Sequence, residues 1–251
     1  MVEKSTLLLA IARAKSAHNG ETLLSAIIVD MGNTVGSTNT NFCKVFSDDR
    51  DAYVLGLWCA DGYHRTSSIG ITNVNWQLIE KFENFLLKHF SSERLRLKIY
   101  EPINYITQTR GKIKTVHFKS AKARQPAYQL YVNSRPLLRE LRHLRLQVTN
   151  MRKREVIWAY LAGRFDGDGS ISRRLNRDCR IVYGNLNEAH GDQALLQRLG
   201  LDKTKTYHYQ AAKTFCVYIS RLQTREFIKG IFPYSVRMQK LVFVPRRDSN
   251  P

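Results

Sequence analysis

The chain has 251 residues, which is enough for one or two domains. Its 43% hydrophobic and 24% charged residues exclude a largely disordered polypeptide. The chain has 40 Lys and Arg residues and 21 acidic residues, so its net charge is +19. This charge disfavours metabolic enzymes with acidic pockets. It favours a polyanionic partner, either nucleic acid or an anionic membrane surface.

The sequence contains neither the apolar runs of a membrane protein nor the cysteine spacing of a disulfide-bonded domain. No apolar run approaches the roughly 18–20 residues of a spanning helix, and the basic residues do not cluster on one amphipathic helix, so we expect no membrane partner. The four cysteines are widely spaced without a C-x-x-C pair. This spacing disfavours zinc knuckles and disulfide frameworks and predicts a reducing intracellular location, in the cytoplasm or an organelle.

Residues 1–50 form an N-terminal extension that has no net charge, with five basic and five acidic residues. Apolar faces predict short helices over 3–17 and 21–29, and the Gly, Ser, Thr and Asn of 31–41 predict a linker. A small helical appendage is the favoured interpretation. A helix-turn-helix DNA reader is the alternative, and the absence of net charge counts against it.

From residue 51 the chain repeats itself, which predicts two halves, 51–148 and 149–251. The first carries 16 basic and 7 acidic residues and the second 19 and 9, so the whole charge surplus divides almost evenly between them. Four pairs of segments match in the same order: VLGLWCADG (54–62) with LAGRFDGDG (161–169), a strand-like run 68–73 with 180–185, an apolar helix 76–90 with 188–199, and 128–141 with 215–227. Each half therefore reads helix, strands, helix, strands, helix, as expected for a duplication.

Three runs alternate basic and apolar residues: 94–100, 112–119 and 203–209. A period of two predicts strands with basic side chains on one face and apolar ones toward a core. A sheet face of one charge sign repels itself unless a polyanion covers it. The candidate DNA-binding residues are Arg94, Arg96, Lys98, Lys112, Lys114, Arg173, Arg174, Arg180, Lys203 and Lys205.

The two nine-residue blocks predict a seam between packed helices. Gly56 and Ala60 lie four residues apart, as do Gly163 and Gly167, so small residues line one stripe of each helix and permit close approach. If these stripes pack, Asp61 and Asp168 meet at the negative ends of two helix dipoles. A divalent cation would relieve that repulsion, with the carbonyl oxygens of Ala60 and Gly167 as further ligands.

These blocks resemble the signature of LAGLIDADG homing endonucleases in their single-chain, two-motif form, over about residues 51–247. The resemblance implies an α+β fold of two pseudo-symmetric αββαββα halves, with a β-saddle over double-stranded DNA and the motif helices at the central seam. It implies a monomer that uses Mg²⁺, or another divalent cation such as Mn²⁺, to break both DNA strands at a long site, leaving 3′ overhangs. Carried over by motif position, the essential acids are Asp61 and Asp168.

The same comparison suggests further catalytic residues. The polar residue that ends the strand after each motif is assigned to Asn73 in the first half and to Asn185 in the second. The basic residue before each final helix is assigned to Arg152 and Arg237, where the family usually has Lys, with Lys153 and Lys240 as alternatives. Two departures stand out: Cys59 occupies the position of Asp166, and is interpreted as tolerated packing, while Arg164 occupies a usually apolar position.

The mechanistic hypothesis is metal-assisted hydrolysis of one phosphodiester per strand. The polar and basic candidates would order the attacking water and offset charge in the transition state. Two alternatives share the fold: an RNA maturase that assists splicing, with intron RNA as partner, and a DNA-binding regulator without chemistry. Loss of a motif acid would favour either alternative, and both acids are present.

Overall fold

The computed structural model describes residues 48–63, 67–105, 113–172 and 178–243. All of them belong to one compact unit, residues 42–251. The predictions made for residues 1–47 lie outside the described residues. Among the described helices, none combines the length and apolar character needed to cross a membrane.

The first half begins with the helix that carries the first motif. Asp48 caps this helix, since its side chain accepts hydrogen bonds from the backbone N–H groups of Arg50 and Asp51. The elements are α3 (Asp49–Asp61), β1 (Gly62–Tyr63), β2 (Ser68–Asn73), α4 (Trp76–Leu87), η2 (Ser92–Arg94), β3 (Arg96–Glu101), β4 (Lys114–Lys119), β5 (Ala127–Asn133) and α5 (Arg135–Leu146). Their strands form one sheet in the order β1-β2-β5-β3-β4.

The second half repeats this order after a short helix, η3 (Val148–Asn150). Its elements are α6 (Arg154–Asp168), β6 (Gly169–Ile171), β7 (Cys179–Tyr183), α7 (Leu186–Arg198), β8 (Thr204–Tyr209), β9 (Thr214–Ile219), α8 (Arg221–Ile231) and α9 (Val236–Phe243). The sheet order is β6-β7-β9-β8. The predicted αββαββα plan is therefore confirmed, with two additions: the edge strand β4, parallel to β3, and the helix α9.

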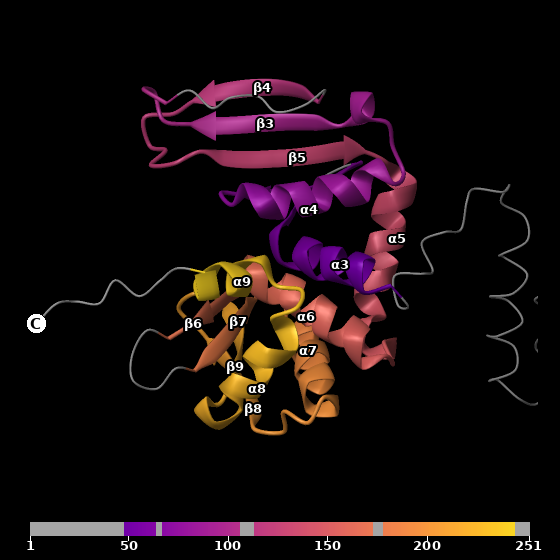
Figure 1. Ribbon diagram of the computed structural model, residues 1–251, viewed down its shortest axis with the longest axis vertical. Coiled ribbons are helices and arrows are strands. Elements are labelled where there is room, and N and C mark those ends of the chain that lie inside the picture. Colours follow the sequence, from indigo (N-terminus) through magenta and orange to yellow (C-terminus); the bar gives the residue numbers. More distant parts are fainter. Residues whose placement is uncertain (1–47, 64–66, 106–112, 173–177, 244–251) are drawn as a thin grey trace, which may run out of the picture. The chain divides into compact units, whose positions relative to one another are not determined.

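One face of each sheet packs against helices and the other is open. In the first half α4 lies beside the strands, as Figure 1 shows, and its apolar side packs on β2 and β5. On β3 the side chains of Leu97 and Ile99 point into this core, whereas Arg96 and Lys98 lie on the open face. The predicted alternation is confirmed for this strand.

The alternation is wrong for the two outer strands. On β4 the apolar side chains of Val116 and Phe118 are exposed, and cross-strand pairing puts them on the same open face as Lys98. On β8 Tyr207 and Tyr209 are also exposed, on the same face as Lys205. On each strand these apolar residues lie two or four positions after a lysine, Lys114 or Lys205, so strand alternation places them on the same open face instead of in a core.

Candidate active site

The two motif helices, α3 and α6, pack together through glycine. A β-carbon at Gly56 would lie 2.0 Å from the carbonyl oxygen of Tyr160, and one at Gly163 would lie 2.0 Å from that of Tyr53. Such distances leave room only for hydrogen, so the backbones of the two helices are in direct contact. The predicted small-residue seam is confirmed.

The seam brings the ends of both helices together. A β-carbon at Gly167 would lie 2.4 Å from the β-carbon of Ala60 and 3.2 Å from Oδ2 of Asp61. Asp61 therefore lies against the last turn of α6, which ends at Asp168. The two predicted acids are neighbours at the C-terminal ends of two helices, where helix dipoles disfavour negative charge.

Both acids are partly buried, and burial is the main cause of their altered acidity. It raises the pKa of Asp61 to about 6, opposed by a hydrogen bond from Asn73 and assisted by the negative charge of Asp168. Burial also raises the pKa of Asp168, while the cation of Arg164 lowers it and Glu188 raises it. The site therefore holds two carboxylates whose ionisation needs positive charge.

Asn73 lies in this site. Its Nδ2 group donates a 2.7 Å hydrogen bond to Oδ2 of Asp61, and its Oδ1 accepts one from the backbone N–H of Asn75. This contact fits the predicted position of a polar residue beside the acid.

Asn185, by contrast, is not the counterpart of Asn73. Gly62 pairs with Ile71 in the first half, and the matching Gly169 pairs with Ile181 in the second, so the counterpart of Asn73 is Tyr183. Asn185 caps α7 by accepting hydrogen bonds from two backbone N–H groups, and it corresponds to Asn75, which caps α4. Matching the two strands by their final Asn placed them two residues out of register.

Arg152 is also misplaced in the sequence-based assignment. It is exposed and precedes α6, as does the alternative Lys153, which occupies the N-cap position. With a rise of about 1.5 Å per residue, Asp168 lies roughly 20 Å away at the other end of α6. The residues before α6 therefore cannot serve the acids at its C-terminal end.

Arg237 and Lys240 both lie on helix α9. Nη1 of Arg237 donates to the carbonyl oxygens of Phe165, Asp166 and Gly169, at distances of 3.0, 3.3 and 2.8 Å. Its positive charge lowers the pKa of Asp61. Nζ of Lys240 donates a 3.3 Å hydrogen bond to Oδ1 of Asn75. Arg237 lies within the first turn of the helix, not before it.

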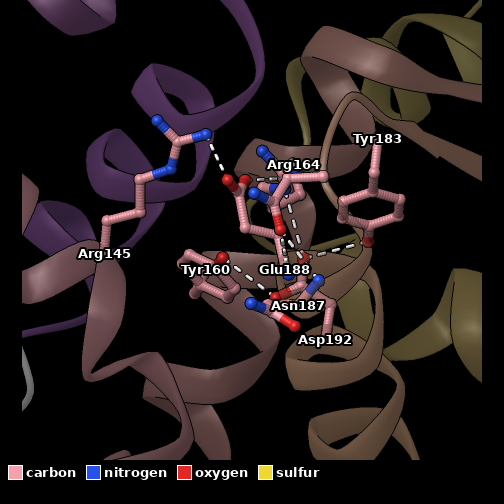
Figure 2. A network of polar contacts seen from close by, with 8 residues as sticks. Arg145, Tyr160, Arg164, Tyr183, Asn187, Glu188 and Asp192 are labelled. Carbon is pink, nitrogen blue, oxygen red and sulfur yellow. Dashed lines mark hydrogen bonds and ion pairs between the residues drawn. The ribbon is translucent and has the colours of Figure 1, made fainter. Parts of the chain in front are cut away.

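A second polar cluster surrounds Arg164, whose role the sequence did not indicate (Figure 2). This side chain is 1% exposed, its Nε lies 3.1 Å from Oδ2 of Asp192, and its guanidinium lies 4.4 Å from the ring centroid of Tyr183. Tyr160 and Tyr183 each donate a 2.9 Å hydrogen bond to Asp192. The signal in the sequence that could have revealed this cluster is the charged Arg164 at the motif position where the first motif has the apolar Leu57.

The same cluster links the two halves. Glu188 accepts a hydrogen bond from Arg145 at the end of α5 and lies 3.6 Å from Nη2 of Arg164. Cys59, where the first motif lacks an acid, is buried nearby, and burial raises the pKa of its thiol to about 12. It is thus a neutral packing residue, consistent with its interpretation in the sequence.

The open face of the first sheet carries three of the predicted DNA-binding residues. Cross-strand pairing sets Arg96 opposite Lys114 and Tyr131, and Nζ of Lys98 lies 5.3 Å from the ring centroid of Tyr131. Arg94 differs, since it lies in η2, over the ring of Phe90.

The second sheet repeats this arrangement with fewer cations. Arg180 and Lys205 both pair with Tyr218, the counterpart of Tyr131. Lys203 is exposed just before β8. The remaining candidates, Lys112, Arg173 and Arg174, lie outside the described residues.

The acids suit a hard cation but do not form a complete cage. Within the described ranges, no three His, Cys, Asp or Glu side chains lie together as metal ligands. Mg²⁺ commonly binds one or two carboxylates and completes its shell with water and phosphate oxygens. Asp61 and Asp168, with terminal carbonyl groups such as those of Ala60 and Gly167, fit such a site.

Comparison with known proteins finds solved structures that have a similar fold. No protein-family model and no curated protein sequence matches this chain. Solved structures of I-DmoI do: the complex with DNA and Ca is 16% identical, with a TM-score of 0.55, over 80% of this chain and 100% of that one.

Two further structures agree. Mesophilic variants of the homing endonuclease I-DmoI are 16% identical, with a TM-score of 0.52, over 76% of this chain and 97% of theirs. The G20S variant with target DNA in the presence of Mg is 17% identical, with a TM-score of 0.52, over 75% and 98%. The chain thus has the fold of a single-chain, two-motif LAGLIDADG homing endonuclease.

Proposed function

We propose that this protein is a site-specific DNA endonuclease that depends on a divalent cation. The observation that carries the proposal is the meeting of Asp61 and Asp168 at the ends of two helices in backbone contact. Two carboxylates in that position repel each other, and a structural role does not require them. The solved neighbours of the same fold include complexes with target DNA in the presence of Mg and with DNA and Ca, which supports the same assignment.

The residues of the site would have different catalytic roles. Asp61 and Asp168 would hold Mg²⁺, whose chemistry is to polarise phosphoryl oxygens and lower the pKa of a bound water. Asn73, through its hydrogen bond to Asp61, would orient that carboxylate. Arg237 and Lys240 would place positive charge beside the negative charge that develops in the transition state.

The open sheet faces would bind the duplex. Arg96, Lys98 and Lys114 in one half, and Arg180 and Lys205 in the other, would contact phosphates or guanine edges in the major groove. Two such faces on one chain would span a long, asymmetric site. We further propose that both strands are cut, by a monomer, leaving 3′ overhangs.

The decisive experiment uses a randomised duplex library with Mg²⁺, followed by sequencing of the cut ends. We expect one cut sequence family with 3′ overhangs. Asp61→Asn and Asp168→Asn should each abolish cleavage while leaving the dissociation constant for the recovered site nearly unchanged. Full activity of either variant would contradict the assignment of the acids.

The same library separates the alternatives. A DNA-binding regulator would select a sequence and cut nothing in any divalent cation. An RNA maturase without nuclease activity would do neither, and would instead accelerate splicing of a structured intron RNA. We place both behind the nuclease because both motif acids are present and lie together.

A further inference from the structure

Asp166, the acid two residues before Asp168, is tied to α9. Its carboxylate is 2% exposed and accepts four hydrogen bonds. The donors are the hydroxyl of Tyr53 at 2.7 Å, the hydroxyl of Ser235 at 2.5 Å, and the backbone N–H groups of Val236 and Arg237 at 2.7 and 3.4 Å. Three of these four bonds come from the beginning of α9.

These bonds make Asp166 a cap supplied by another helix. The first N–H groups of a helix have no partner within it, and a carboxylate there also interacts favourably with the helix dipole. Ser235, which is completely buried, completes the cap by accepting a 3.1 Å hydrogen bond from the N–H of Met238. The carboxylate therefore determines where α9 begins relative to the motif helix α6.

Helix α9 carries both basic candidates of the site, Arg237 and Lys240. Arg237 binds carbonyl oxygens at the end of α6, and Lys240 reaches Asn75 of the first half. Asn75 is in turn bonded to Asn73, and Asn73 to Asp61. A chain of contacts thus runs from Asp166 through α9 to Asp61.

The surroundings of Asp168 differ. The charged groups that alter its pKa are Arg164 and Glu188, and neither belongs to α9. At the first-half position that matches Asp166, the residue is Cys59, whose neutral thiol cannot cap a helix as a carboxylate does. The hydrogen bonds from Lys240 through Asn75 and Asn73 therefore connect α9 to the Asp61 side of the seam.

We propose that Asp166 and Ser235 are positioning residues, which hold α9 so that Arg237 and Lys240 act on the phosphodiester cut at Asp61. The site at Asp61 is then a composite, with its acid from the first half and its cations from the second. The inference rests on the proposed nuclease function and adds to it a difference between the two strand cuts.

The test measures both strand cuts separately. A duplex carrying the recovered site, with a different label on each strand, is cut in Mg²⁺ by saturating full-length protein in a single turnover. The variants are Asp166→Asn, Ser235→Ala, Arg237→Gln and Lys240→Gln. The matched control is Ser220→Ala, a serine that also precedes a helix, α8, but whose buried hydroxyl has no hydrogen-bond partner within the described residues.

Asp166→Asn and Ser235→Ala should slow one strand cut by about 10–100-fold, the range for lost supporting contacts at metal sites, and leave the other within a few-fold. The slowed strand should be the one that Arg237→Gln and Lys240→Gln slow, and Ser220→Ala should leave the ratio unchanged. This ratio is insensitive to misfolding, because unfolded protein lowers both rates equally.

Equal slowing of both strand cuts in Asp166→Asn and Ser235→Ala would overturn the inference, as would a stronger slowing of the opposite strand cut. A wild-type protein that cuts neither strand would overturn the proposed function, and the inference with it. Wild-type cutting with an unaltered ratio in the variants would overturn the inference alone.

Discussion

Asp61 lies against Gly167 of the opposing helix, where a methyl group would be 3.2 Å from its Oδ2 atom. The glycine thus lets one motif helix bring its terminal carboxylate to the last turn of the other. Because burial and Asp168 both raise the pKa of Asp61, this proximity disfavours its ionised form. The seam combines tight packing with electrostatic repulsion, and its stability should therefore respond to pH.

Asp61→Asn should stabilise the metal-free protein above pH 6. A folded-state pKa of about 6, above the ordinary value of 3.8, means that the folded chain binds the proton more tightly than the unfolded chain. The stability of the wild type should then fall as pH rises from about 4 to about 6, by at most about 3 kcal/mol at 1.36 kcal/mol per pKa unit. Urea unfolding of both proteins in EDTA measures this difference.

Two controls define that experiment. Below about pH 3 the two proteins should differ little, because Asp61 is then largely protonated in both the folded and the unfolded state. Added Mg²⁺ should stabilise the wild type more than Asp61→Asn. A wild type that gains stability relative to the variant as pH rises would refute the argument.

Gly56→Ala should destabilise the fold by about 3 kcal/mol or more, at the upper end of overpacking effects. Its methyl group would lie 2.0 Å from the backbone oxygen of Tyr160, which no side-chain rotation can relieve. Gly191→Ala in α7 is the matched control, since its methyl group would meet only ordinary contacts at 3.6 Å or more. Thermal unfolding should show that the control is neutral or gains up to about 1 kcal/mol from helix propensity.

Arg164→Leu should cost about 3–5 kcal/mol, the range for removing one partner of a buried ion pair. It would restore the apolar residue found at Leu57 but leave the carboxylate of Asp192, which is 0% exposed, without its cation. Adding Asp192→Asn should recover part of the loss, because the buried charge is then removed. Denaturant unfolding of the single and double variants checks this, and equal stability of Arg164→Leu and wild type would be inconsistent with it.

Lys98→Gln should weaken DNA binding and reduce the dependence of log affinity on log salt by about 0.9, if Lys98 contacts one phosphate. Lys98 lies on the open face of the first sheet, over Tyr131. Lys229→Gln removes the same charge from an exposed site on helix α8 and should leave the slope unchanged. Titrations at several salt concentrations measure both slopes, and equal slopes for the two variants would speak against an open-face interface.

Much of the fold could be predicted because it is a duplication with a local signature. Small residues four apart determine which helices pack, so Gly56 and Gly163 predicted the seam correctly. The periodicity of β3 predicted its faces, since a helix covers one side of that sheet. The same rule failed at β4 and β8, because Lys114 and Lys205 have the same parity along the strand as the apolar residues that follow them, which places all of them on one face.

The sequence by itself determined the duplicated plan, the two acids and the basic character of the strands, because each depends on residues close together in the chain. Only the tertiary structure decided which residues share a site. The strand registers make Tyr183, not Asn185, the counterpart of Asn73. The length of α6 separates Arg152 from the two acids. The hydrogen bonds between Asp166 and α9 place Arg237 where its charge acts on Asp61. These relationships depend on contacts between distant segments, which no local pattern specifies.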